Sequence, residues 1–320
     1  GAGFVGTNFC RELKRQQREF EILDLTPSVE FRQHSKLADV RDIESLRQSI
    51  TGEIVINLAA VHRDDITDPM QYHTTNVLGA KNIVDICTEK NIRKIIFTSS
   101  VAVYGFANPE TDETGDINPF NNYGKTKHEA ELVFRRWHEE KNGHLIIVRP
   151  TVIFGEGNRC NVYNLFNQIY SGRFLMIGSG NNKKSMAYVG NVAAFLVACV
   201  DVDQHFGIFN YVDTPDFSMN DLVLLTRKAL LNKNNIGVRL PVWLGTFAGT
   251  LADSVSSFTN IKFPVSNIRV KKFISNSQFK SAKSELLGFE PPYTIFEGIS
   301  RTLEHDFLKP KLDSQVFYTE

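Results

Sequence analysis

Cysteine, tryptophan and surplus charge are all scarce in this chain of 320 residues. Its four cysteines are far apart and form no C-x-x-C pair, which indicates reduced, mostly buried thiols of a cytoplasmic protein. Basic and acidic residues number 36 each, so the formal net charge is zero. No run of lysine or arginine is interleaved with aromatic residues, and we therefore expect no nucleic-acid partner.

Apolar runs long enough to cross a membrane are also missing. The longest, Val192–Val200 and Pro241–Ala252, fall short of the ~20 residues that a spanning helix needs. The second run mixes bulky apolar residues with glycines and precedes a basic group, Lys262, Arg269, Lys271 and Lys272. This pattern fits an amphipathic helix at the inner face of the cytoplasmic membrane, beside anionic lipid. It equally fits a helix packed on the core or on a second copy, and we expect a homodimer.

A hydroxyl, a phenol and an ammonium group occur at a spacing that favours acid-base chemistry on an alcohol. The apolar run Lys94–Phe97 predicts a buried parallel strand that delivers Thr98, Ser99 and Ser100 to its carboxyl end, where ligands of open α/β sheets bind. A helix beginning near Tyr123 places Lys127 one turn later on the same face. Positive charge there favours the tyrosine phenolate, because an unperturbed phenol titrates near ~10.

The first six residues contain the glycine pattern G-x-G-x-x-G and run into a segment typical of a helix. Glycines at this spacing let the backbone approach a pyrophosphate, and a helix amino terminus offers free N–H donors. The pattern normally follows a strand in the middle of the sheet, and none precedes Gly1. We therefore expect a short segment of about ten residues to come before it, which an intact-mass measurement of the native protein would test.

An acidic residue and two small ones mark the next strand ends. Asp24 closes the strand Glu21–Asp24, about 20 residues after the glycines, as expected for a carboxylate that binds both hydroxyls of an adenosine ribose. A carboxylate there repels a 2′-phosphate, which favours NAD over NADP, although Arg32 or Lys36 would soften the effect. The run Ile54–Ala60 predicts a further strand whose small final residues let a cofactor lie close.

Taken together, these motifs resemble an extended short-chain dehydrogenase/reductase of the NAD-dependent sugar epimerase/dehydratase family. The resemblance spans nearly the whole chain and implies an α/β fold, with a Rossmann-type doubly wound parallel sheet and a smaller C-terminal substrate domain. It implies three catalytic groups, Ser100, Tyr123 and Lys127. The implied NAD-binding residues are Gly3, Phe4, Val5, Gly6, Asp24, Asp39, Val40, Leu58, Ala59, Ala60, Asn76, Ser99, Tyr123, Lys127 and Pro150.

One departure within the family concerns the reaction. In this family, 4,6-dehydratases carry Asp-Glu directly after the hydroxyl residue, whereas this chain has Val101 and Ala102. Apolar residues cannot move protons, so the sequence favours 4-epimerisation without net redox change. The resemblance implies that Tyr123 takes the proton of the C4 hydroxyl, Ser100 holds the C4 oxygen and a 4-keto sugar forms.

Three basic residues are candidates for contact with a sugar diphosphate. Lys184 stands where nucleotide-sugar epimerases carry an arginine, and it keeps the charge but loses the bidentate fork. Arg159 precedes an expected helix, and Arg63 lies in a loop expected over the substrate cleft. His62, next to Arg63 and followed by two aspartates, has no second ligand group at helical or hairpin spacing, so we expect no metal.

Several local strings, among them Arg149–Glu156 and Lys183–Asn191, resemble family members that act on polyprenyl-linked N-acetylhexosaminyl diphosphates in O-antigen synthesis. The predicted substrate is therefore a lipid-linked sugar diphosphate. A small-molecule UDP-sugar stays open as the alternative. A net NAD-dependent dehydrogenase acting on an alcohol or sugar, which would release NADH, is a second alternative. A non-catalytic dinucleotide sensor is a third, although it has little need for Ser100, Tyr123 and Lys127 together.

The alternation of strands and helices predicts the domain organisation. Residues 1–155 form the NAD-binding domain, to which 189–212 return, and residues 156–188 and 213–320 form the substrate-binding domain. The predicted helices are Pro69–Lys90, Tyr123–Asn142, Val189–Val200, Met219–Leu231 and Thr294–Phe307, and the later strands are Leu145–Val148 and Phe206–Tyr211.

Overall fold

A computed structural model describes residues 1–320 except 64–65, 67, 260–265, 282–287, 311–313 and 320. Its largest sheet contains four parallel strands in the order β10-β5-β4-β3. These are β3 (Ile54–Asn57), β4 (Lys94–Thr98), β5 (His144–Pro150) and β10 (Phe206–Tyr211). The middle strands are near-continuous apolar runs because both faces of this sheet are covered.

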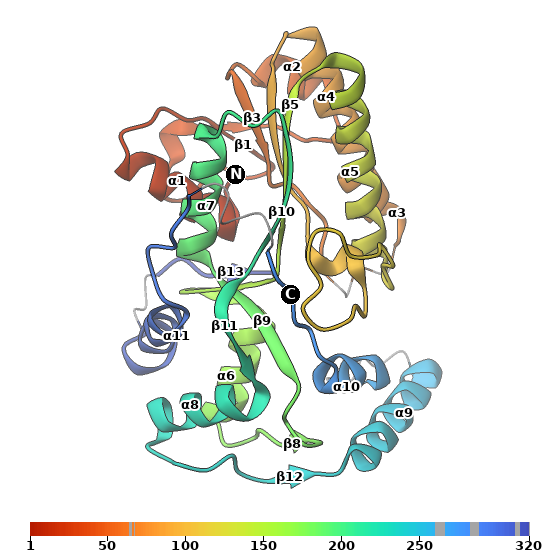
Figure 1. The fold of residues 1–320 in the computed structure, drawn as a ribbon, viewed down its shortest axis with the longest axis vertical. Coiled ribbons are helices and arrows are strands. Elements are labelled where there is room, and N and C mark those ends of the chain that lie inside the picture. Colours follow the sequence, from red (N-terminus) through yellow and green to blue (C-terminus); the bar gives the residue numbers. More distant parts are fainter. Residues whose placement is uncertain (64–65, 67, 260–265, 282–287, 311–313, 320) are drawn as a thin grey trace.

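Helices lie on both faces of the large sheet (Figure 1). On one face, α2 (Ile43–Ser49), α4 (Gly79–Glu89) and α5 (Asn122–Lys141) enclose an apolar cluster that includes Phe97 and Phe134. On the other, α1 (Phe4–Arg15) and α7 (Val189–Asp201) enclose a cluster that includes Ile96, Ile146 and Phe195. The predicted doubly wound α/β arrangement is confirmed.

A second parallel pair, β1 (Ile22–Asp24) and β2 (Ser35–Leu37), stands beyond β3, and the short turn η1 (Arg32–His34) lies directly before β2. Within the described residues, β1 pairs with β2 and β3 pairs with β4, and no ladder joins the two sheets. A cavity therefore extends between them, past Ile22, Ile54 and Val55. The strand that the sequence predicts before the glycine turn stays a prediction.

The remaining elements pack below the carboxyl ends of the large sheet (Figure 1). Strands β6 (Val152–Phe154), β9 (Lys183–Tyr188) and β11 (Asp213–Ser218) form a mixed sheet. Helices α6 (Asn161–Tyr170), α8 (Met219–Leu231) and α11 (Ile295–Leu303) surround it, sharing a core that includes Phe166, Tyr188 and Leu222. The short pairs are β8 (Met176–Ile177) with β12 (Arg239–Leu240) and β7 (Asn158–Arg159) with β13 (Phe317–Tyr318).

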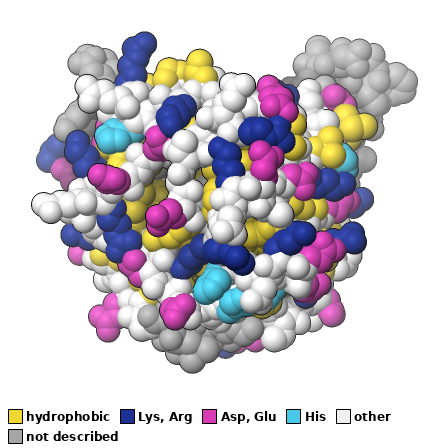
Figure 2. Space-filling model, turned by 90° about the horizontal axis from the view of Figure 1, so that it is seen from above, with side chains coloured by type: hydrophobic (Ala, Val, Ile, Leu, Met, Phe, Trp, Pro, Cys, Tyr) yellow, Lys and Arg dark blue, Asp and Glu magenta, His cyan; other side chains and the backbone are white. Residues whose placement is uncertain are grey.

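The chain leaves the large sheet after β5 and comes back to it through α7 and β10, which pairs with β5 over six residues. Helix α8 belongs to the lower part of the molecule, as does the helical hairpin of α9 (Val242–Thr259) and α10 (Asn267–Ile274). Acidic and basic side chains lie interspersed on the face shown in Figure 2, in keeping with the zero net charge. The division into two domains at the predicted boundaries stays a proposal.

Candidate active site

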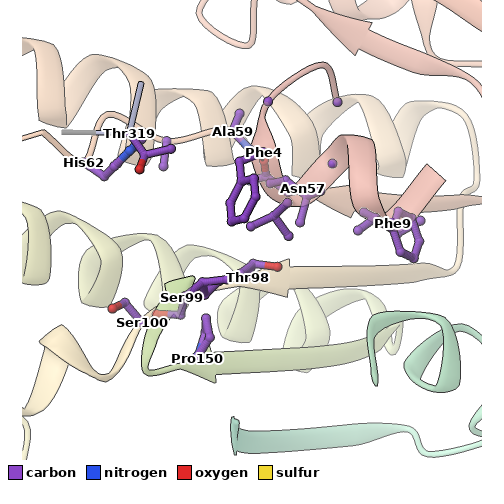
Figure 3. Close-up of a pocket in the computed structure, with 18 of the residues that line it drawn as sticks. Phe4, Phe9, Asn57, Ala59, His62, Thr98, Ser99, Ser100, Pro150 and Thr319 are labelled. Carbon is purple, nitrogen blue, oxygen red and sulfur yellow. Dashed lines mark hydrogen bonds between the residues drawn. The ribbon is translucent and has the colours of Figure 1, made fainter. Parts of the chain in front are cut away.

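A cavity of about 2060 Å³ opens at the carboxyl ends of the strands. Typical ligand pockets occupy about 300–1,000 Å³, so this one has room for a dinucleotide together with a sugar diphosphate, even allowing for the apolar gap beside β1. It runs from the glycine turn past Ser100 and Tyr123 to Lys184 and Lys272. Figure 3 shows Ser99 and Ser100 following β4, with Pro150 at the end of β5 close by.

The glycine turn at the start of α1 has the shape of a pyrophosphate cradle. Gly3 is the residue before the helix, and a Cβ built on it would meet nothing within 4 Å, so the backbone there is open to a ligand. A Cβ on Gly6 would lie 2.2 Å from the carbonyl oxygen of Gly1, so only glycine fits. The free N–H groups of the first turn of α1 suit an anion. These residues therefore fit NAD.

The other predicted NAD-binding residues fall into two groups. Asp24, whose carboxylate accepts from the N–H of Ala2 at 2.7 Å, lines the cavity, as do Asp39, Val40, Leu58, Ala59, Ala60, Ser99 and Pro150. Asn76 instead lies outside the set of described lining residues. Its buried amide bonds both the N–H and the carbonyl of Val61 and the hydroxyl of Thr126. Asn76 therefore fixes the loop after β3 against α5.

The structure brings Ser100, Tyr123 and Lys127 together. Ser100 precedes the short turn η3 (Val101–Tyr104), and its side chain hydrogen-bonds that of Tyr123. Tyr123 lies in the first turn of α5, and Lys127 follows one turn later, almost fully buried. Gly124 permits this approach, because a Cβ there would lie 2.4 Å from the carbonyl oxygen of Ala102 in η3.

Burial shifts the pKa values of Tyr123 and Lys127 in opposite directions. It raises the pKa of Tyr123 to about 12, and the hydrogen bond from Ser100 only partly counters this. Burial lowers the pKa of Lys127 to about 7, although the carboxylate of Glu131 favours its charged form. Both shifts have the cause expected of ionisable groups placed in an apolar setting. The Lys127 ammonium lies 4.3 Å from the centroid of the Phe97 ring. The phenolate therefore needs additional positive charge in the loaded site.

A buried ion pair supports the catalytic helix, and sequence reasoning missed it. Glu131, one turn after Lys127, accepts two bonds from Arg149, at 2.9 and 2.6 Å. Arg149 also donates to the hydroxyl of Tyr104 at 2.7 Å, and Tyr104 donates to Asn210 at 2.8 Å. Burial would raise the pKa of Glu131, but the bonds from Arg149 lower it to about 2. The network joins α5, β5, η3 and β10. The repeat of Tyr123, Lys127 and Glu131 at four-residue steps was its one signal in the sequence.

The substrate end of the cavity holds Lys184 but neither predicted arginine. The Lys184 ammonium donates to the carbonyls of Lys272 and Ser275, both at 2.7 Å, and burial lowers its pKa to about 8. Arg159 and Arg63 are outside the set of described lining residues. Arg159 lies 3.1 Å from the carboxylate of Asp306 and 4.0 Å from the ring centroid of Tyr163. The Arg63 carbonyl accepts a bond from Tyr72.

Further lining residues escaped sequence reasoning. Phe106 and Phe120 line the cavity and stack with ring centroids 4.6 Å apart, and Lys272 of α10 lies over the ring of Phe120. His62, considered from the sequence only as a metal ligand, has its ring centroid 6.4 Å from that of Tyr123. Within the described part of the chain, no three His, Cys, Asp or Glu side chains are grouped as metal ligands. Asp64 and Asp65, which follow His62 and Arg63, lie outside the described residues.

Residues 1–211 match the NAD dependent epimerase/dehydratase family, and the chain belongs to that family. The predictions of a Rossmann-type fold, of NAD as the cofactor and of an enzyme of this class are confirmed. Over 325 aligned residues the chain is 42% identical to the N-acetyl-α-D-glucosaminyl-diphospho-ditrans,octacis-undecaprenol 4-epimerase of Escherichia coli O157:H7, covering 100% of this chain and 97% of that protein.

Other relatives are more distant. The UDP-glucose 4-epimerase of Vibrio cholerae is 26% identical, with 94% of this chain and 92% of that protein covered. Among solved structures, UDP-glucose 4-epimerase from Thermotoga maritima has a TM-score of 0.76 at 19% identity, covering 95% of this chain and 96% of that one. UDP-N-acetylglucosamine 4-epimerase from Bacillus cereus has a TM-score of 0.74 at 18% identity, covering 94% of each. At these identities the structures show the shared fold.

Proposed function

We propose that this protein is a 4-epimerase that interconverts N-acetylglucosaminyl- and N-acetylgalactosaminyl-diphosphoundecaprenol through a 4-keto sugar, in O-antigen or polysaccharide synthesis. The observation that carries the proposal is the 42% identity to an undecaprenol-linked 4-epimerase over the full length of the chain. The assembled Ser100, Tyr123 and Lys127 supply the acid-base chemistry that such a reaction requires.

The mechanism assigns one role to each of the three groups. Tyr123, as phenolate, accepts the proton of the C4 hydroxyl, while the Ser100 hydroxyl hydrogen-bonds the C4 oxygen. The charge of Lys127 favours the phenolate. The glycine turn and Asp24 would hold NAD, which would supply the hydride acceptor for C4 and the hydride donor for the return step. After the keto sugar has rotated to present its other face, Tyr123 returns the proton to the C4 oxygen. No net oxidation results.

The residues after Ser100 support epimerisation over dehydration. Val101 and Ala102 line the cavity where dehydratases of the family carry an acid pair, and neither side chain can transfer a proton. The stacked Phe106 and Phe120 continue the wall from there. The site beside Ser100 therefore offers apolar surface against which a sugar ring can change its face.

The diphosphate is best accommodated at the far end of the cavity. Lys184 lines that end, and Lys272, whose carbonyl anchors it, lines it as well. Two ammonium groups at this end attract a diphosphate and leave the sugar free to rotate. The keto sugar must rotate so that its other face can accept hydride. Arg63 and Arg159, the other predicted contacts, have less support, because neither lines the cavity in the part of the chain described.

An exposed apolar stripe supports peripheral contact with the inner face of the cytoplasmic membrane. Trp243, Phe247 and Leu251 follow one another at helical spacing on α9 and are 66%, 66% and 56% exposed. Gly245 and Gly249, on the opposite side of the helix, pack against Ile177 and Asn267. No helix among the described residues is long and apolar enough to cross a membrane.

The hairpin that carries this stripe also borders the substrate end of the cavity. Helix α10, which packs on α9, presents Arg269 and Lys271 at its surface and sends Lys272 to the cavity wall. A basic surface beside an apolar one suits an anionic lipid headgroup layer. Lys262, also part of the basic group in the sequence, lies outside the described residues. A homodimer remains a prediction.

The test of the proposed function compares two substrates. Purified protein is incubated separately with N-acetylglucosaminyl-diphosphoundecaprenol in detergent and with UDP-N-acetylglucosamine. The products are then hydrolysed, and the galacto epimer, N-acetylgalactosamine, is quantified in each. We expect epimer from the lipid-linked substrate. The variant Tyr123→Phe should lose most turnover, by about 10² or more, while still binding NAD. Epimer from the nucleotide sugar alone would establish the alternative that the UDP-sugar relatives favour, and release of NADH with each turnover would establish a dehydrogenase.

A further inference from the structure

Strand β13 brings residues near the carboxyl end of the chain to the edge of the cavity. It pairs in parallel with β7, where the Phe317 N–H donates to the carbonyl of Gly157 at 2.9 Å. The Thr319 hydroxyl donates to the side-chain oxygen of Asn158 at 2.7 Å. Phe317 is buried, and its ring lies 5.6 Å from that of Phe4 in the first turn of α1.

The same segment forms part of the cavity wall. Val316–Thr319 all line the cavity, and the ring of His62 hydrogen-bonds the backbone of Thr319. Figure 3 shows Thr319 beside His62, on the opposite side of the space from Ser99 and Ser100. Because His62 is also the neighbour of Tyr123, the segment reaches the reacting end of the site.

These contacts fall at two points along the path of a dinucleotide. Phe4 belongs to the turn whose free N–H groups suit the pyrophosphate. His62 lies beside Tyr123, where hydride is exchanged. The segment Val316–Thr319 therefore connects the pyrophosphate turn to the reacting end, across an otherwise open cleft.

We propose that Val316–Thr319 is a further part of the NAD-binding site and that it slows the release of the reduced cofactor. The inference rests on the proposed epimerase function for its purpose, because an epimerase that loses NADH halfway is left with a keto sugar that it cannot reduce. Phe317 secures the segment on the pyrophosphate turn, and Thr319 secures it on His62. The segment thus holds the dinucleotide in the cleft from the side opposite Ser99.

A substitution at Gly157, which does not line the cavity, offers a way to displace this segment. Its φ of +77° is the left-handed region that favours glycine, and a Cβ there would lie 2.6 Å from the carbonyl oxygen of Gln315. Gly157→Ala therefore pushes the segment from its place without altering a lining residue. Gly172 is a matched control, because its φ is +71° and a Cβ there meets nothing within 4 Å.

The experiment measures the dissociation of NADH from purified protein, by stopped-flow displacement with excess NAD and without any sugar. Gly157→Ala and Phe317→Ala should release NADH about tenfold faster or more, as expected when a contact acts mainly on the off-rate. Gly172→Ala should release it at the wild-type rate. Thermal unfolding of each variant, followed by circular dichroism, checks that the fold is retained.

Two results would overturn the proposal. Wild-type release from both Gly157→Ala and Phe317→Ala would show that the segment does not hold the cofactor. Equal acceleration in Gly157→Ala and Gly172→Ala, with wild-type release from Phe317→Ala, would assign the effect to backbone strain. Because no sugar is present, the outcome is independent of the lipid-linked or nucleotide-linked substrate, so failure here and failure of the proposed function are distinguishable.

Discussion

Tyr123 and Lys127 occupy a setting that opposes the charge state each of them needs. The reaction requires phenolate and ammonium, whereas burial raises the pKa of Tyr123 to about 12 and lowers that of Lys127 to about 7. Such opposed shifts are characteristic of groups arranged for catalysis. The positive charge of a bound nicotinamide ring would favour the phenolate form of Tyr123.

The shift at Lys127 predicts how stability depends on pH. Between about pH 7 and pH 10.5 the unfolded lysine holds a proton that the folded one has lost, so wild-type stability rises with pH through this window. Below about pH 7 Lys127 is protonated in both the folded and the unfolded state, so folding carries the full cost of burying the charge. Lys127→Met abolishes this gain. In urea unfolding of cofactor-free protein, the free energy of unfolding of wild type should therefore rise relative to that of the variant between about pH 7 and pH 9.

Lys125→Met, on the exposed side of the same helix, serves as the control and should keep the wild-type dependence. Parallel pH profiles for wild type and Lys127→Met would contradict the shift.

At the scale of elements, the site depends on how α5 is held against its neighbours. The pair Glu131 and Arg149 joins α5 to β5 and, through Tyr104, to the turn that begins with Ser100. A buried ion pair adds little net stability compared with an apolar core, because both charges lose their hydration. Its value here is geometric, since a shift of α5 would separate Tyr123 from Ser100.

Breaking that pair should be costly. Glu131→Gln keeps the shape of the side chain but leaves the Arg149 guanidinium buried without its counter-charge, so we expect a loss of about 3–5 kcal/mol in the free energy of unfolding. Glu140→Gln, which removes an exposed ion pair with Arg136 on the same helix, should leave the free energy of unfolding close to that of wild type. Equal, small effects of the two substitutions in denaturant titrations would refute the structural role.

Local patterns predicted most of these elements. The apolar run predicted β4, the helix predicted from Tyr123 is α5, and α8 has the predicted bounds. The strand predicted over Ile54–Ala60 ends at Asn57, because the Asn57 side chain accepts from the N–H of Ala59 and turns the chain.

Other features lie beyond local reasoning. The helix predicted over Pro69–Lys90 is interrupted by the π-helical turn η2 (His73–Leu78) between α3 (Met70–Tyr72) and α4, and it is this turn that carries the inward-facing Asn76. The helix predicted over Thr294–Phe307 likewise ends in a π-helical turn, η5 (Glu304–Leu308). The contact of β13 with β7 joins residues far apart in the chain, and its two-residue length leaves no periodic signal. The candidate site follows the same rule: its glycines and catalytic groups come from local motifs, whereas the position of Arg159 depends on distant Asp306.

At the scale of the whole molecule, the active site and the apolar stripe of α9 belong to one lower region. The α9–α10 hairpin presents the stripe to solvent and sends Lys272 to the cavity. A substrate whose lipid tail stays in the bilayer would have to enter at this end, with the diphosphate passing Lys184 and the sugar reaching Tyr123. This arrangement gives a protein without a spanning helix among its described residues a way to meet such a substrate.

The stripe predicts membrane binding that two substitutions should weaken. Trp243→Ser with Phe247→Ser removes two exposed side chains, and transfer of apolar surface is the main driving force for such contact. In flotation with anionic liposomes, we expect wild type to float and the double variant to stay largely in the soluble fraction. Leu132→Ser, at an exposed apolar position on α5, should float like wild type. Wild type that remains soluble with and without anionic lipid would rule out the contact, and a change of oligomeric state in the double variant would assign the stripe to a second copy.

The return of β10 to the edge of the large sheet also orders events during synthesis. Leu145 of β5 pairs with Phe206 of β10, so the sheet gains its edge only after the ribosome has delivered the whole intervening stretch. The partner of β7 comes later still, since Phe317 and Tyr318 follow β10 in the chain. Pairings over such separations form slowly. The nascent chain should therefore acquire its complete cleft only after β13 has emerged from the ribosome. Until then its unpaired parallel strands are exposed to binding by chaperones.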